Sequence, residues 1–225
     1  MSTGARFPQG PCHKTLPSGK AEAKLQKPQV SRYATREPDH RMNLWLRLLA
    51  YLLTAPFRPR LANAGDASRL SFRVWPHDLD PSLHMNNARY LALMDLGRID
   101  ILVSTGLLRA VVKHRWTPIA SKVAIRYRRE LRLFQRIRLE TRILTWDATN
   151  VVMEQVFLNV GGRRDGQVAA HALFKGGIYD RSTRAFVPIG KLMETIGVSA
   201  EPPAATPDVE AFLKADGAMR DGLRN

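Results

Sequence analysis

The chain has 225 residues, 44% of them hydrophobic and 24% charged, which suits one domain with a sizeable core. Its single cysteine, Cys12, excludes an intramolecular disulfide, and the scattered histidines show no zinc-site spacing, so no metal is expected. The formal charge of +15 would suit an anionic partner. No helix-turn-helix, zinc-finger or RNP pattern accompanies it, so we expect no nucleic-acid partner.

The basic residues are most concentrated near the N-terminus. Residues 1–41 carry eight basic and three acidic side chains and are rich in Pro, Gly and Ser, without an apolar period. This composition predicts a disordered basic tail, which binds an anionic membrane, nucleic acid or nothing specific. Met42 follows directly, so the tail is either an extension or a consequence of start-codon choice.

Residues 42–60 form an apolar segment that begins MNLWLRLLAYLLTAPF. The run predicts a helix ended by Pro56 and Pro59, and it is shorter than the ~20 apolar residues of a transmembrane helix. One interpretation is an interfacial helix with Trp45 and Tyr51 at headgroup level. Another is a helix packed on the domain or on a neighbouring subunit. A signal peptide starting at Met42 lacks a convincing cleavage site. We therefore expect a cytoplasmic protein, membrane-associated under the first interpretation.

Residues 69–200 alternate between strand and helix patterns. A strand at 70–75 is followed by a polar loop at 76–86 and by a helix at 87–104 that is apolar on most sides, as a buried helix is. Four strand-like stretches follow at 116–132, 136–147, 150–160 and 167–180, then a closing helix at 187–197. The order predicts an α+β domain in which a long antiparallel sheet buries one helix. Residues 201–225 read as a C-terminal tail, Pro/Ala-rich and then weakly helical.

The segment most informative about chemistry is DLDPSLHMNNARY, residues 78–90. It places carboxylates, an imidazole and amides immediately before the buried helix. The unpaired N–H groups at a helix N-terminus could hold the oxyanion that develops when a thioester carbonyl is attacked. A nearby carboxylate could act as the nucleophile or as the base for water.

This segment resembles the D-x-D-x-x-x-H-[VM]-N-N-x-x-Y loop of hot-dog-fold thioesterases, both the 4-hydroxybenzoyl-CoA thioesterase-like proteins and the plant acyl-ACP thioesterases. YRRE at 127–130 resembles a second motif of the acyl-ACP group. Over roughly 42–195 the chain looks most like the thioesterase superfamily member 6 type. The resemblance implies a hot-dog fold, an antiparallel sheet wrapped around one long central helix.

The same resemblance implies hydrolysis of fatty acyl thioesters, acyl-CoA or acyl-ACP, to free acid and thiol. It implies no cofactor, and it implies a homodimer or a dimer of dimers. The alternative on the same fold is a non-catalytic protein that binds acyl thioesters or lipid at a membrane surface.

Residue roles are carried over from matching positions. Asp80 matches the nucleophile or base, His84 matches a histidine that assists proton transfer, and Glu130 matches a second carboxylate. Ser82 stands where the acyl-ACP motif has asparagine. The substrate-binding candidates are Ser82, Asn86, Asn87, Ala88, Arg89 and Arg128.

Each role has a structural alternative. Asp80 could cap a turn, His84 could be a satisfied buried histidine, and an asparagine could cap the helix. Strand alternation places Glu130 in a surface ion pair beside Arg128 and Arg132, unless a β-bulge near Arg128–Arg129 turns it inward. Two clusters of residues also have a functional and a structural interpretation. A cluster of arginines either binds phosphates or forms a solvated strand face. A set of apolar residues either borders a tunnel for the acyl chain or belongs to the core. The arginines are Arg89, Arg126, Arg128, Arg129 and Arg132; the apolar residues are Met85, Leu91 and Met94.

Overall fold

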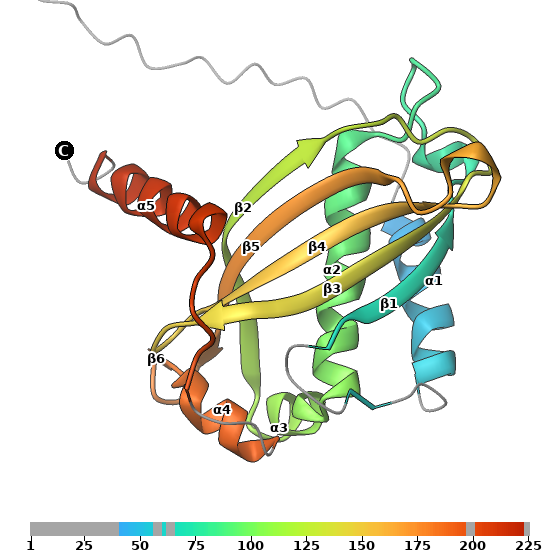
Figure 1. Cartoon of the computed structure of the whole chain (residues 1–225). Helices are drawn as coiled ribbons and strands as arrows, with labels where there is room; N and C mark the ends of the chain where they lie inside the picture. The colour runs from blue at the N-terminus through green and yellow to red at the C-terminus, as the bar shows by residue number, and fades with distance from the viewer. Residues whose placement is uncertain (1–40, 56–59, 62–65, 197–200, 223–225) are drawn as a thin grey trace, which may run out of the picture. The chain divides into compact units, whose positions relative to one another are not determined.

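The computed structural model describes residues 41–55, 60–61, 66–196 and 201–222 (Figure 1). All of these residues belong to one compact unit. The predicted basic tail lies outside the described residues except for Arg41.

The core of the fold is an antiparallel sheet with the strand order β1-β3-β4-β5-β2, to which the short β6 is added beside β5. The strands run over Ser68–Arg73 (β1), Trp116–Tyr127 (β2), Arg136–Trp146 (β3), Val151–Val160 (β4), Val168–Asp180 (β5) and Ala185–Phe186 (β6). Each of the five longer strands lies within two residues of a predicted start, and the predicted strand 116–132 ends early, at Tyr127.

The sheet curves around helix α2, Asn87–Ser104, which crosses its concave side (Figure 1). The predicted buried face of this helix is confirmed: Tyr90, Leu93, Met94, Gly97 and Ile101 are all buried. Gly97 allows the close approach, because a Cβ there would lie 2.4 Å from Thr141 Oγ1 on β3. The predicted fold class is therefore confirmed: α+β, with an antiparallel sheet wrapped around one long central helix.

One row of paired residues crosses the sheet beneath the start of α2. The register joins one residue from each of the five longer strands: Leu70, Leu139, Phe157, Ala170 and Tyr127. The Tyr90 ring packs edge-on against Phe157 and Tyr127, with ring centroids 5.1 and 5.0 Å apart. Edge-to-face aromatic pairs are favourable beyond their buried area, so this row fixes the first turn of α2.

Helix α1, Arg41–Thr54, lies along the domain near β1 and α2 (Figure 1). Tyr51 is 7% exposed, and its hydroxyl donates a 2.7 Å hydrogen bond to Asp100 of α2. Ser68 of β1 donates a second hydrogen bond to the same carboxylate. These contacts attach α1 to the domain, so one face of the helix packs on the domain, as the second interpretation of this segment predicted.

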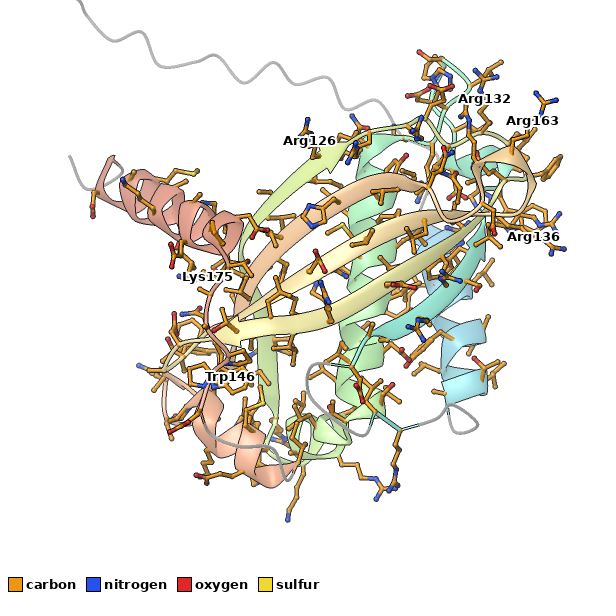
Figure 2. The ribbon with its side chains drawn as sticks, in the orientation of Figure 1. Arg126, Arg132, Arg136, Trp146, Arg163 and Lys175 are labelled. Atoms are coloured by element: carbon orange, nitrogen blue, oxygen red, sulfur yellow. The ribbon has the colours of Figure 1, made fainter. Side chains whose placement is uncertain are left out.

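Three further helices close the two faces of the sheet. Helices α3 (Leu107–Lys113) and α4 (Ile189–Thr195) lie at the end of α2, and α5 (Pro207–Gly222) packs on the convex side of the sheet. Lys175 of β5, labelled in Figure 2, lies below α5 and pairs with Asp216 at 2.9 Å. Part of the stretch read from sequence as a tail is thus a helix that buries Val209 and Phe212.

Candidate functional site

The loop before α2 is joined at both ends to neighbouring backbone. The 3₁₀ turn Pro76–Asp78 leads into it, and Asn86 N–H donates to the Asp78 carbonyl at 2.8 Å. Met85 N–H donates at 2.8 Å to Leu131, which follows β2, and His84 forms a bridge with Arg132. The motif loop and the segment after YRRE therefore lie side by side, although they are almost fifty residues apart in sequence.

Asp80 lies half-buried inside this loop. Its Oδ1 accepts the backbone N–H of Ser82 at 2.9 Å and that of His84 at 3.3 Å. Its own N–H donates to the His84 carbonyl at 2.8 Å, and Leu83 between them has a left-handed φ of 60°. The predicted turn-capping role is thus present, and it fixes the position of the carboxylate.

Asn86 caps α2: its side chain accepts the Ala88 N–H at 2.8 Å. This matches the predicted capping role, and the Arg89 N–H donates at 2.9 Å to the Asn86 backbone carbonyl, so both amides are paired within the first turn. The Asn87 carbonyl accepts a long, 3.4 Å hydrogen bond from Tyr127. Burial raises the pKa of Tyr90 to about 12, and it also raises the pKa of Tyr127, so both phenols remain protonated at neutral pH.

Glu130 lies at the edge of the site as an exposed side chain. Its Oε1 is 3.0 Å from Arg132, the surface ion pair predicted from strand alternation, and Arg132 lowers the pKa of Glu130. The backbone is irregular just after β2, since the N–H groups of Arg128 and Arg129 both donate to the carbonyl of Ala169. The irregularity nevertheless leaves Glu130 paired at the surface.

The two arginines predicted to bind substrate have different surroundings. Arg89 donates to the His77 carbonyl at 3.2 Å and lies 4.0 Å from the buried Asp78 carboxylate. Arg128 lines a hollow of about 460 Å³ on the convex side of the sheet, together with Arg142, Glu154 and His171. Arg89 belongs to helix α2 and Arg128 follows the end of β2, so the two side chains are carried by different parts of the fold.

Other arginines gather at the end of the sheet nearest the loop. Figure 2 shows Arg132, Arg136 and Arg163 projecting at this end, where β3 begins and β4 ends. Arg73 of β1 lies opposite Arg136 in the sheet register. Sequence reasoning named only Arg132 of these, because the others are separated along the chain and converge only in the fold.

An apolar cavity of about 370 Å³ lies farther along α2. Its walls come from α2, α3, α4 and strands β2 to β5, and include Leu102, Ile119, Met153, Ile178 and Met193. The charged residues Asp95 and Arg98, which are hydrogen-bonded to each other, also line it. Met85 and Met94, which sequence reasoning suggested for a tunnel, are instead buried core residues, and Leu91 does not line the cavity.

The arrangement combines a fixed carboxylate, an imidazole, the N-terminal amides of a helix and an apolar cavity on the same helix. Such a set can activate water or attack a carbonyl, and it can hold an oxyanion. Among the residues that the structure describes, no group of three or more His, Cys, Asp or Glu side chains is placed to hold a metal ion.

Comparison with known proteins identifies the family of the chain. Residues 74–213 match the model of the thioesterase-like superfamily, and the chain belongs to that superfamily. Thioester hydrolysis is the general chemistry of this class. A relative from Xenopus laevis, named protein THEM6, is 34% identical over 119 residues. That match covers 52% of this chain and 58% of the relative, so the chain spans little more than half of its length.

Solved structures share the fold. The probable thioesterase YbaW from Escherichia coli has 25% sequence identity and a TM-score of 0.52, over 57% of this chain and 95% of that one. The protein SAV2348 from Staphylococcus aureus, whose structure is in complex with CoA, has 17% identity and a TM-score of 0.54. That alignment covers 65% of this chain and 93% of the other, and it shows a common fold.

Proposed function

We propose that this protein hydrolyses fatty acyl thioesters of coenzyme A or acyl carrier protein, with Asp80 as the essential carboxylate. The observation that carries the proposal is the position of Asp80. Two backbone amides hold its carboxylate in a loop whose ends are tied by the 2.8 Å Asp78–Asn86 hydrogen bond, directly before α2. A general base must be held in a fixed position near the oxyanion site, and the fixed carboxylate in the loop that leads into α2 supports this role for Asp80.

In the proposed reaction, Asp80 takes a proton from water as the water oxygen attacks the thioester carbon. The positive end of the α2 dipole, at the N-terminus that Asn86 caps, stabilises the oxyanion of the tetrahedral intermediate. The C–S bond then breaks, and the thiolate leaves with the proton that Asp80 received. His84, whose backbone amide contacts Asp80, assists this proton transfer. The products are a carboxylic acid and a free thiol.

The apolar cavity suits the acyl chain. It begins at Asp95, eight residues after the start of α2, which is about 12 Å along a helix that rises 1.5 Å per residue. A volume of about 370 Å³ falls within the range of ligand pockets, ~300–1,000 Å³. A thioester at the helix N-terminus would thus direct a medium or long acyl chain along α2 into an apolar space.

The carrier that we propose is anionic. Coenzyme A bears phosphates and carrier proteins are acidic, and guanidinium groups bind both through paired hydrogen bonds. The arginine-rich end of the sheet, which adjoins the motif loop through the His84–Arg132 bridge, supports such a carrier. The S. aureus structure with CoA supports coenzyme A as the first carrier to test.

We further propose a homodimer, or a dimer of dimers, formed through β2. This strand is twelve residues long and, in the described part of the chain, pairs only with β5. Its Ile119, Val123 and Tyr127 side chains are 36–40% exposed. A long apolar edge strand is prone to pair with another strand, and a second copy of β2 would cover it.

One observation supports the alternative of a non-catalytic binder. Asp80 Oδ1 already accepts two backbone amides, which is what a purely structural aspartate would do. A binder would keep the cavity and the arginine-rich end but release no thiol.

A thiol-release assay with short, medium and long acyl-CoAs tests the proposal on the full chain. We expect release that rises with chain length until the cavity is filled. Binding of acyl-CoA without release would favour the binder. The proposed function would be overturned if the protein neither bound nor hydrolysed any acyl-CoA and then gave the same result with acyl carrier proteins.

A further inference from the structure

Helix α1 has one face that the domain does not cover. Five large apolar side chains on it are 45–68% exposed: Trp45, Leu46, Leu49, Leu52 and Leu53. Their spacing of i, i+1, i+4, i+7 and i+8 places them on a single side of the helix, which we name the outer face of α1. Leu48 and Tyr51 pack against the core from the opposite side.

The apolar side chains of this face lie next to each other, unlike the singly scattered hydrophobic residues of an ordinary protein surface. The α1 backbone is fourteen residues long, about 21 Å, so it is shorter than the ~30 Å hydrocarbon core of a bilayer. No helix in the part of the chain that the structure describes is long and apolar enough to cross a membrane. A helix of this kind can lie in the plane of an interface.

The charge of the segment that contains α1 indicates which kind of lipid surface it would bind. Residues 40–65 contain Arg41, Arg58 and Arg60, besides Arg47, which is paired with Asp78, and they contain no aspartate or glutamate. Cationic residues beside an apolar helical face add electrostatic attraction to anionic lipids. We propose that α1 docks the protein on an anionic lipid surface with the outer face inserted, and that the net positive charge of residues 40–65 adds attraction to the anionic headgroups.

A second copy of the chain is less well suited to cover this face. Arg47 donates to the carbonyl of Arg73 in β1, which places α1 at the β1 edge of the sheet. The exposed strand β2 is the opposite edge in the strand order, and Figure 1 shows α1 and β2 on opposite sides of α2. A dimer formed through β2 would therefore leave the outer face open.

Docking would also bring the motif loop to the surface. Arg47 points inward from α1 and binds Asp78 at 2.6 Å, two residues before Asp80. On the proposed function, a fatty acid released beside α1 would leave directly into the lipid. The docking itself does not depend on hydrolysis, because the outer face and the loop are separate sites.

Vesicle co-sedimentation of the full chain tests the proposal. The vesicles are phosphatidylcholine with and without phosphatidylserine, and the variant is Leu49→Glu with Leu53→Glu. We expect wild-type protein to bind the anionic vesicles more tightly than the neutral ones. The variant should bind the anionic vesicles with an affinity at least about tenfold lower than that of the wild type, because two inserted apolar side chains are replaced by charged ones.

Matched controls are Val112→Glu on α3 and Met219→Glu on α5, whose side chains are 69% and 64% exposed. Both should bind like the wild type, which would attribute the loss to the outer face. The proposal would be overturned if the wild-type protein bound neither kind of vesicle. It would also be overturned if the double variant bound the anionic vesicles as tightly as the wild type.

Light scattering in solution separates lipid docking from self-association. The double variant should have the same molar mass as the wild type. A smaller mass for the variant would mean that the outer face joins two copies of the chain, and would overturn the proposal. Thiol release without vesicles, measured in parallel, should be unchanged in the variant, so a failure of the proposed hydrolysis would be seen separately.

Discussion

Arg47 Nη2 lies 2.6 Å from Asp78 Oδ2, so helix α1 is held by an ion pair against the loop that carries Asp80. The two side chains are 15% and 1% exposed. Asp78 Oδ2 also accepts the Trp75 N–H at 2.8 Å, while Oδ1 lies 3.6 Å from His77 and 4.0 Å from Arg89. The first aspartate of the motif therefore ties the loop to α1, and its chief partner comes from outside the motif.

Replacing Arg47 with methionine should destabilise the protein by on the order of 3 kcal/mol, because the buried Asp78 carboxylate loses its closest cation. Adding Asp78→Asn should restore most of the loss, since the uncompensated charge disappears. Urea unfolding measures both. Arg142→Met is the control: Arg142 pairs with Glu154 at the same 2.6 Å but is 51% exposed, so its loss should be below about 1 kcal/mol. Equal losses for Arg47 and Arg142 would contradict this account.

Gly97→Ala should destabilise the protein by about 1–3 kcal/mol, because the new methyl group would overlap Thr141 and Gln155 where α2 meets the sheet. Gly217→Ala in α5 should be neutral or stabilising, since nothing lies within 4 Å of that Cβ and alanine favours a helix. Thermal unfolding of the two variants compares a crowded and an open helical glycine. An unchanged Gly97→Ala midpoint would show that α2 does not approach the sheet this closely.

Tyr90 should make the protein less stable in alkali. Burial raises its pKa from 10.0 to about 12, so between these values the unfolded chain loses the phenol proton before the folded protein does. The free energy of unfolding should fall as pH rises from 10 to 12, by roughly 2 kcal/mol, and be unaffected by this group below pH 10. Tyr90→Phe should show a shallower decline in urea unfolding over the same range. Identical slopes would contradict the burial of the hydroxyl.

The fold could be predicted largely from sequence because its periodicities are local. The buried helix was predicted at 87–104 and is observed as Asn87–Ser104, and the sheet strands follow the predicted alternation. Helix α3 was missed, since its seven residues are too few for a clear apolar period. Helix α5 read only as a weak helix in a tail, because its packing partners Val152 and Leu173 lie in distant strands.

The site was less predictable, because its contacts are long-range. The pairing of His84 with Arg132 and of Asp78 with Arg47 joins segments about thirty to fifty residues apart. No periodicity encodes such contacts. The surface ion pair of Glu130 with Arg132 was predicted, although β2 ends at Tyr127, before either residue. The contact of Arg89 with the His77 carbonyl depends on the 3₁₀ turn before the motif loop.

Leu102→Trp should shift the preference toward shorter acyl chains, because the larger side chain fills part of the apolar cavity. We expect kcat/KM for the longest substrate to fall roughly tenfold more than for the shortest, the scale on which apolar pockets discriminate small differences in substrate size. Val112→Trp, at an exposed position on α3, should leave the ratio unchanged. A uniform loss across chain lengths in Leu102→Trp would place the acyl chain elsewhere.

The central claim is that Asp80 acts on the thioester and does more than cap its loop. The most direct test measures thiol release and acyl-CoA binding side by side for wild type and Asp80→Asn. Asparagine keeps an oxygen that can accept the Ser82 and His84 amides, so the loop should persist and binding should survive. Release should fall by roughly two to four orders of magnitude, the usual contribution of a general base. Release that is equal in the two proteins would contradict the account.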